Sequence, residues 1–183
     1  MNLNQTPAAE RPHIGFFGCR NAGKSSIVNA VTGQNLAVVS NVKGTTTDPV
    51  VKAMELLPAG PVVMIDTPGI DDDGELGKLR VEKSYQMLNR TDLAIVVIDG
   101  GTGIKKEDFA LLKEIEKRKV PFIIAVNKKR SFKRTPDTVK GQGKVPEESL
   151  IYVSAETGEG IRELKKRIGE SICTEKNKKK NRG

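Results

Sequence analysis

Apolar and polar positions along the chain predict an alternation of strands and helices. Short apolar runs that end at glycine, proline or aspartate are typical of strands, whereas apolar residues three or four positions apart are typical of helices. Strands are therefore expected at residues 12–17, 50–57, 62–66, 93–98, 120–126 and 150–153. Helices are expected at residues 25–32, 79–89 and 104–119, with Leu79, Val81, Tyr85 and Leu88 near one face of the second, and with Ile161, Leu164, Ile168 and Ile172 marking a last helix.

The order of these elements predicts the fold class. Residues 93–98 and 120–126 are continuous apolar runs, which is typical of strands that are covered on both faces in a parallel sheet. Residues 50–57 and 62–66 are joined by a Pro-Ala-Gly-Pro turn and should pair antiparallel. We expect an α/β fold of three layers, with a doubly wound, mostly parallel sheet that contains one antiparallel strand and binds its ligand at the carboxyl ends of the strands.

Three segments lack a clear apolar period and are expected to be irregular. They are residues 33–48, 67–78 and 127–148, of which the first two suit mobile loops that order around a ligand. The resulting division of the chain is a flexible lead-in at residues 1–11, one domain at residues 12–173 and a disordered basic tail at residues 174–183.

Composition narrows the class of protein. A length of 183 residues with 37% hydrophobic residues suits one globular domain that buries a large core. No run reaches the roughly 18 apolar residues that a membrane span needs, and the first residues lack the apolar core of a signal peptide. We therefore expect a cytoplasmic protein with no membrane partner.

The charge and the cysteine content of the chain do not indicate a nucleic-acid partner, a metal site or a catalytic thiol. The net charge is +8, and five basic residues against one acidic residue lie in the last nine positions. A lysine-rich end without aromatic residues is expected to be a solvated tail, so nucleic acid is not an expected partner. Cys19, Cys173 and the single His13 are too few for a closed metal site, and Cys19 is expected to be a free thiol without a catalytic role.

Residues 18–26 contain the phosphate-binding pattern GxxxxGK(S/T), which runs from Gly18 to Ser25 between a predicted strand and a predicted helix. Its glycines let backbone N–H groups turn toward phosphate oxygens, its lysine brings a positive charge to the β- and γ-phosphates, and its serine offers a hydroxyl to Mg²⁺. The candidate phosphate-binding residues are Arg20, Asn21, Ala22, Gly23, Lys24, Ser25 and Ser26.

Three further motifs follow in an order that fits the same site. Asp66 begins the sequence Asp-Thr-Pro-Gly at a strand end, where a carboxylate can hold Mg²⁺ through water and Gly69 N–H can reach the γ-phosphate. Thr46 lies in a threonine cluster that supplies another hydroxyl for Mg²⁺. Two later dipeptides lie where a base would be read, Asn127-Lys128 and Ser154-Ala155.

Together these motifs resemble the translation-factor-like GTPases of the TrmE–Era–EngA group, P-loop GTPases with a small Ras-like G domain. A narrower likeness, over about residues 3–126 and again over 149–170, is to the N-terminal GTPase domain of HydF, the maturation GTPase of [FeFe]-hydrogenase. The segments GTTTDPV and MELLPAGPVVMIDTPGIDDDGELGKLRVEKSYQ are the basis of that likeness. It implies a GTP- and GDP-binding switch that serves hydrogenase maturation through protein partners, and it is compatible with a dimer of G domains.

The resemblance also implies how phosphate charge is neutralised. Mg²⁺ would be held by Ser25, Thr46 and Asp66, and Asn21 matches the asparagine that holds K⁺ beside the phosphates in this group. An asparagine that merely favours the turn is the alternative. The implied catalytic residues are Lys24, Asn21, Thr46 and Gly69. Ile70 replaces the water-orienting glutamine of Ras-like enzymes, so intrinsic hydrolysis should be slow.

One motif departs from the family pattern. The base-reading motif NKxD ends in a carboxylate that accepts hydrogen bonds from guanine, but this chain has Arg130, which can only donate. Either another acid such as Asp137 replaces it or the nucleotide binds loosely, while Ala155 N–H can still recognise the guanine O6. Two alternative functions stay open, a nucleotide-binding regulatory module without hydrolysis and an RNA- or ribosome-associated GTPase.

Overall fold

The computed structural model describes residues 10–33, 49–70, 74–127 and 145–181. Its strands are β1 (His13–Gly18), β2 (Val50–Leu56), β3 (Gly60–Asp66), β4 (Leu93–Asp99), β5 (Phe122–Asn127) and β6 (Leu150–Val153). Its helices are α1 (Lys24–Thr32), α2 (Gly74–Leu88), α3 (Lys106–Lys117) and α5 (Ile161–Lys180), with short 3₁₀ helices η3 (Arg20–Ala22) and η4 (Glu147–Ser149).

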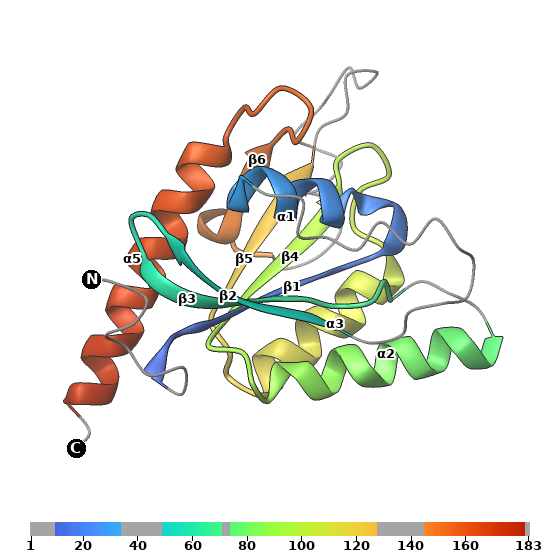
Figure 1. Cartoon of the computed structure of the whole chain (residues 1–183). Coiled ribbons are helices and arrows are strands. Elements are labelled where there is room, and N and C mark those ends of the chain that lie inside the picture. Colours follow the sequence, from blue (N-terminus) through green and yellow to red (C-terminus); the bar gives the residue numbers. More distant parts are fainter. Residues whose placement is uncertain (1–9, 34–48, 71–73, 128–144, 182–183) are drawn as a thin grey trace.

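The strands form one sheet in the order β2-β3-β1-β4-β5-β6. All neighbouring pairs are parallel except β2 and β3, which form the antiparallel hairpin that the sequence predicts. Helices α1 and α5 contact each other on one face of the sheet, and α2 and α3 contact each other on the opposite face (Figure 1). The prediction of a three-layer, mostly parallel α/β fold is therefore confirmed.

The core lies on both faces of the central strands. Every residue from 93 to 98 in β4 is at most 2% exposed, and Ile14, Phe16 and Phe17 of β1 are fully buried. This burial is the physical reason for the continuous apolar runs, because neither face of these strands meets water. Because β1, β3, β4, β5 and β6 are parallel, their carboxyl ends all lie at one edge of the sheet.

Helix α2 differs from the sequence prediction at its start. It begins at Gly74, so the irregular segment expected at residues 67–78 is shorter, and residues 67–70 at the start of that segment are described. Leu79, expected near one face of this helix together with Val81, Tyr85 and Leu88, is 42% exposed. The buried stripe instead includes Gly77, Ser84 and Leu88, positions that share a face at helical spacing.

The basic end of the chain also differs from its prediction. A disordered tail is expected from residue 174, but α5 continues through Lys180. Lysines in the last turn of a helix interact favourably with its carbonyl dipole, and Lys179 Nζ lies 2.8 Å from Asp92 Oδ1. The predicted loops at 34–48 and 128–144 and the lead-in at 1–9 lie outside the described residues.

Candidate nucleotide-binding site

The phosphate-binding loop joins β1 to α1 and takes a path that only glycine allows at two positions. Gly23 has φ of +83°, and a Cβ built on it would lie 2.2 Å from Asn127 Nδ2. A Cβ on Gly18 would lie 2.4 Å from the backbone oxygen of Val97. Both positions lack room for a side chain, so the two glycines of the motif are required by close packing as well as by backbone conformation.

The remaining residues of the loop lie where the motif predicts. Arg20, Asn21 and Ala22 form η3, whose Ala22 N–H donates to Cys19 O over 3.1 Å. Ser25 and Ser26 lie in the first turn of α1, where N–H groups are not used by the helix itself and can bind an anion. The chain therefore presents backbone donors and the positive end of a helix at the carboxyl end of β1.

Lys24 connects this loop to the end of β3. The residue is 6% exposed, and its ammonium group donates hydrogen bonds to the Asp66 carboxylate and to the backbone oxygen of Thr67. Thr67 is held in turn because its hydroxyl donates to Phe16 O over 2.6 Å. Two motifs that are 42 residues apart are thus brought into direct contact, as their order along the sheet predicts.

The Asp-Thr-Pro-Gly motif and the residue after it contact both the phosphate loop and α2. Ile70 N donates to Gly18 O over 3.3 Å, and Ser84 Oγ of α2 donates to Pro68 O over 3.0 Å. The side chain of Ile70 is 4% exposed and aliphatic, so it has no group that can orient water. These two hydrogen bonds connect the residues that follow β3 to the phosphate loop and to the C-terminal half of α2.

Asn127 connects the phosphate loop to the end of the sheet where a base would be read. It is 4% exposed, its Nδ2 donates to Ala22 O over 3.0 Å, and its Oδ1 accepts from Ala155 N over 3.4 Å. Ser154 closes the following turn by accepting a hydrogen bond from Thr157 N over 3.3 Å at its hydroxyl. The sequence predicts Asn127 as a base-reading residue, and the structure gives it this additional bridging position.

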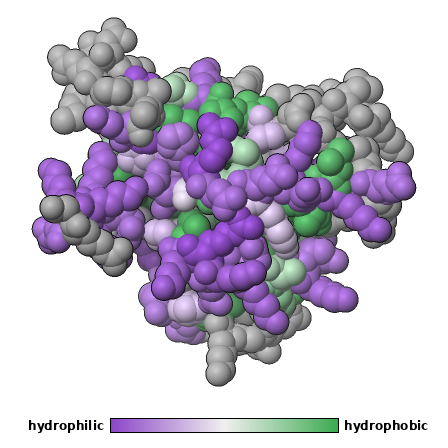
Figure 2. All heavy atoms as spheres, turned by 90° about the horizontal axis from the view of Figure 1, so that it is seen from below, coloured by the Kyte–Doolittle hydropathy of each residue, from purple (hydrophilic) through white to green (hydrophobic). Residues whose placement is uncertain are grey.

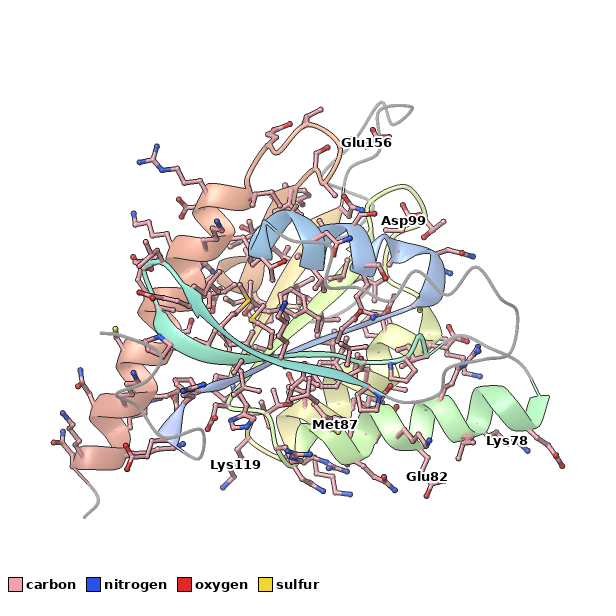
Figure 3. All side chains as sticks on the ribbon, viewed as in Figure 1. Lys78, Glu82, Met87, Asp99, Lys119 and Glu156 are labelled. Atoms are coloured by element: carbon pink, nitrogen blue, oxygen red, sulfur yellow. The ribbon has the colours of Figure 1, made fainter. Side chains whose placement is uncertain are left out.

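The acidic residues at this edge come from separate strand ends. Asp99 ends β4 and Glu156 follows β6, and Figure 3 shows both at the end of the sheet where the phosphate loop lies. Asp99 Oδ1 accepts from Gly101 N over 2.7 Å, which fixes the turn after β4. Among the described residues, no group of three or more His, Cys, Asp or Glu side chains forms a preassembled metal site.

A Mg²⁺ ion fits the residues that are present at the phosphate end. Asp66 offers carboxylate oxygens whose charge is already balanced by one cation, and Ser25 offers a hydroxyl at the start of α1. The third expected ligand, Thr46, lies outside the described residues, as do Lys128, Arg130 and Asp137. The assigned roles of all these residues, of Gly69 and of Asn21 toward K⁺ remain predictions.

Besides the Asn127–Ala22 hydrogen bond, the structure shows a buried contact between Cys19 and Asp108 that the sequence does not predict. Cys19 Sγ donates to Asp108 Oδ1 over 3.4 Å, and both residues are 2% exposed. Asp108 Oδ2 also accepts from Lys105 N over 2.8 Å at the start of α3. Burial raises the pKa of the Asp108 carboxyl above its usual range. The acidic residue in the first turn of the predicted helix at 104–119 is the capping signal that could have indicated it.

Comparison with known proteins decides the family. The profile of the family described as "50S ribosome-binding GTPase" matches residues 13–128, which include the phosphate loop and the Asp-Thr-Pro-Gly motif. The chain belongs to this GTPase family. The prediction of a P-loop GTPase G domain of the TrmE–Era–EngA type is confirmed, and with it the binding of guanine nucleotide. This membership disfavours the alternative of a module without hydrolysis.

Curated relatives of this GTPase are longer proteins. The tRNA modification GTPase MnmE of Heliobacterium modesticaldum is 35% identical over 151 residues, which are 81% of this chain and 32% of MnmE. The GTPase Der of Wolinella succinogenes is 33% identical over 174 residues, 91% of this chain and 36% of Der. The chain thus spans about a third of the length of these relatives.

Solved structures agree on the fold. Era of Aquifex aeolicus bound to GDP and AlF₄⁻ superimposes with a TM-score of 0.71 at 24% identity, covering 87% of this chain and 56% of Era. A probable GTP-binding protein engB superimposes with a TM-score of 0.72 at 23% identity, covering 88% of this chain and 99% of engB. Within the described residues of the GTPase, no helix combines the length and apolar character needed to cross a membrane.

Proposed function

We propose that this chain is the G domain of a Mg²⁺-dependent, K⁺-stimulated GTPase switch that acts in the cytoplasm. The observation that supports this most directly is the buried Lys24 ammonium, which is held between Asp66 and Thr67 inside a complete phosphate-binding motif. Among the described residues, Lys24 binds only this carboxylate and this carbonyl, so its ammonium is well placed to exchange one of these partners for a phosphate oxygen.

Different residues of the site would bind different parts of the nucleotide. Backbone N–H groups at the start of α1 bind phosphate oxygens, and Lys24 adds a charge toward the β- and γ-phosphates. Bound Mg²⁺, held by Ser25, Thr46 and Asp66, would neutralise charge that develops on the phosphates. Gly69 N–H can bind the γ-phosphate. When the γ-phosphate is lost, the loop after β3 would move, and the Ile70–Gly18 and Ser84–Pro68 hydrogen bonds would couple this movement to α2.

The K⁺ role is tested by exchanging K⁺ for Na⁺ at constant ionic strength while GTP turnover is measured. We expect faster turnover in K⁺, and loss of this difference in Asn21→Ala. Asn177→Ala, which removes an exposed amide on α5, is the matched control and should keep the difference. Equal turnover in both salts for the unchanged protein would remove the role given to Asn21.

Base selectivity has its own test because Arg130 replaces the usual carboxylate. Labelled GTP, ATP and XTP are titrated against the chain and against Arg130→Asp. We expect the variant to gain affinity for GTP by about thirtyfold, since a charge-assisted contact contributes about 2 kcal/mol. An unchanged preference would indicate that another group, such as Asp137, already reads the base.

For the cellular role we propose [FeFe]-hydrogenase maturation with protein partners and a G-domain dimer, on the likeness to HydF. An RNA- or ribosome-associated role is the second candidate, because the family is described as ribosome-binding and relatives are named for tRNA modification. Deleting the gene in its host and measuring hydrogenase activity and tRNA modification separates them. Loss of hydrogenase activity alone supports the first role, and altered tRNA alone supports the second.

A further inference from the structure

The surface of α5 has an uneven distribution of charge that the nucleotide site does not use. Five basic residues of this helix have no ion pair or hydrogen bond with any other described residue, and all five are at least partly exposed. They are Arg162, Lys165, Lys166, Lys176 and Lys180. By contrast, Lys178 pairs with Glu175 at 2.8 Å and Lys179 pairs with Asp92 at 2.8 Å.

Helical spacing places the five residues on one face. Arg162 and Lys180 are 18 residues apart, which is five full turns of an α-helix and about 27 Å along its axis. Lys165 and Lys176 are 11 residues apart, close to three full turns. The two exposed acids of the helix, Glu163 and Glu170, lie about a quarter turn round from this face.

The tip of the β2–β3 hairpin divides this face into two basic clusters. A Cβ on Gly169 would lie 2.9 Å from Pro58 Cγ, so the tip rests against the middle of α5, and Figure 1 shows the hairpin turn beside this helix. One side has the N-terminal cluster of Arg162, Lys165 and Lys166, and the other has the C-terminal cluster of Lys176 and Lys180. Residues 166 and 176 are 10 positions apart, about 15 Å along the helix.

A cavity of about 830 Å³ lies between the hairpin tip and the N-terminal cluster. It is lined by Leu57, Pro58, Gly160, Glu163 and the three basic residues of that cluster. Leu57 is 70% exposed, so the tip projects from the surface as a small apolar wedge between two positively charged areas. The face of the molecule seen from below in Figure 2 is mainly hydrophilic, with only small separated apolar areas.

From this arrangement we propose that α5 and the β2–β3 tip bind the backbone of a double-stranded RNA segment. The two clusters would each contact one phosphate strand, and the tip would lie against the wide, shallow minor groove between them. Such contacts read the shape of the duplex and not its sequence, because the tip offers an apolar side chain and no base-specific donor. Without aromatic residues on this face, stacking on single-stranded bases is not available.

The charge of this surface fits any duplex, and the choice of RNA over DNA rests on the RNA-associated role proposed above. The surface is independent of the nucleotide site, because none of the five residues lies near the phosphate loop in sequence or contacts it in a described interaction. GTP binding and RNA binding can therefore fail separately, and an RNA experiment without nucleotide distinguishes the two failures.

The test measures how the affinity of the full chain for duplex RNA depends on salt concentration. Binding is detected by the fluorescence anisotropy of a labelled duplex of about 16 base pairs. Five phosphate contacts give a slope of about −4.5 in log affinity against log salt, so affinity falls about 500-fold between 50 and 200 mM salt. Lys166→Gln/Lys176→Gln removes one contact from each cluster, and its fall should be only about 40-fold.

Lys113→Gln/Lys117→Gln on α3 is the matched control, since both lysines are exposed and the charge change is the same. It should keep the slope of the unchanged protein, and circular dichroism confirms that each variant is folded. Absence of binding at 50 mM salt, or equal slope changes in the two double variants, would overturn the proposal. If a DNA duplex binds with the same affinity as the RNA duplex, or if polyglutamate displaces the labelled RNA as well as unlabelled RNA does, the assignment to RNA is overturned.

Discussion

Removal of the Asn127 side chain tests whether the phosphate loop and the base-reading end of the site form one unit. Asn127→Ala deletes the donor to Ala22 O and the acceptor for Ala155 N, at 3.0 and 3.4 Å. Ala22 is 2% exposed, so its carbonyl loses its partner without gaining water. A buried polar group left without a partner costs about 1–3 kcal/mol, and the half-exposed Ala155 N–H costs less.

We therefore expect Asn127→Ala to lower the free energy of unfolding by about 2–3 kcal/mol, which corresponds to a fall in melting temperature of about 5–10 °C for a domain of this size. GTP affinity should fall by about tenfold or more, because nucleotide must reorder the loop. Thermal unfolding by circular dichroism and titration of labelled GTP measure both quantities.

Two further variants sharpen this test. Asn127→Asp keeps an acceptor for Ala155 N but places an oxygen against Ala22 O, so it should destabilise the protein at least as much as the alanine variant. Asn177→Ala is the exposed control and should leave both quantities unchanged. A melting temperature within 1 °C of the unchanged protein together with full GTP affinity in Asn127→Ala would refute the bridging position.

Further predictions concern packing, pH and surface charge. Gly23→Ala should lower GTP affinity at least tenfold in titrations, since its Cβ would lie 2.2 Å from Asn127 Nδ2 at a φ of +83°. Asp108→Asn changes the pH dependence of thermal stability: burial raises the folded-state pKa of Asp108 above the unfolded value of about 3.8, so its contribution is full below that pH and is lost as pH rises through the folded pKa. The variant should lack this loss in melts from pH 3 to 7, and an identical profile would contradict it. Lys179→Gln breaks an exposed pair with Asp92, so urea unfolding should show a change below about 1 kcal/mol, and a larger loss would indicate a structural role for the end of α5.

Much of the site could be predicted because its signals are local. The spacing from Gly18 to Ser25 and the apolar run before it specify a strand, a loop and a helix, and the structure forms β1 and α1 there. The Asp66 motif follows an apolar run for the same reason. The parallel order of the strands then brings both motifs to one edge of the sheet.

The features that the sequence did not predict are of two kinds. Some are contacts between residues far apart in the chain, and one is a segment whose composition is compatible with either a disordered tail or a helix. Cys19 and Asp108 are 89 residues apart, and Asn127 and Ala22 are 105 apart, so no local pattern relates them. Residues 174–180 lack apolar positions, which suggests a tail. Lysine is nevertheless a good helix former, and these residues extend a helix that its buried face already stabilises.

The phosphate loop is predicted to bind guanine nucleotide through the ammonium group of Lys24. The most direct measurement is a titration of labelled GTP with Mg²⁺ against the unchanged chain and Lys24→Ala, with circular dichroism confirming that the variant is folded. A lost charge-assisted hydrogen bond of about 2 kcal/mol predicts at least a thirtyfold weaker affinity. Equal affinity for GTP in the folded variant would show that Lys24 does not contribute to nucleotide binding.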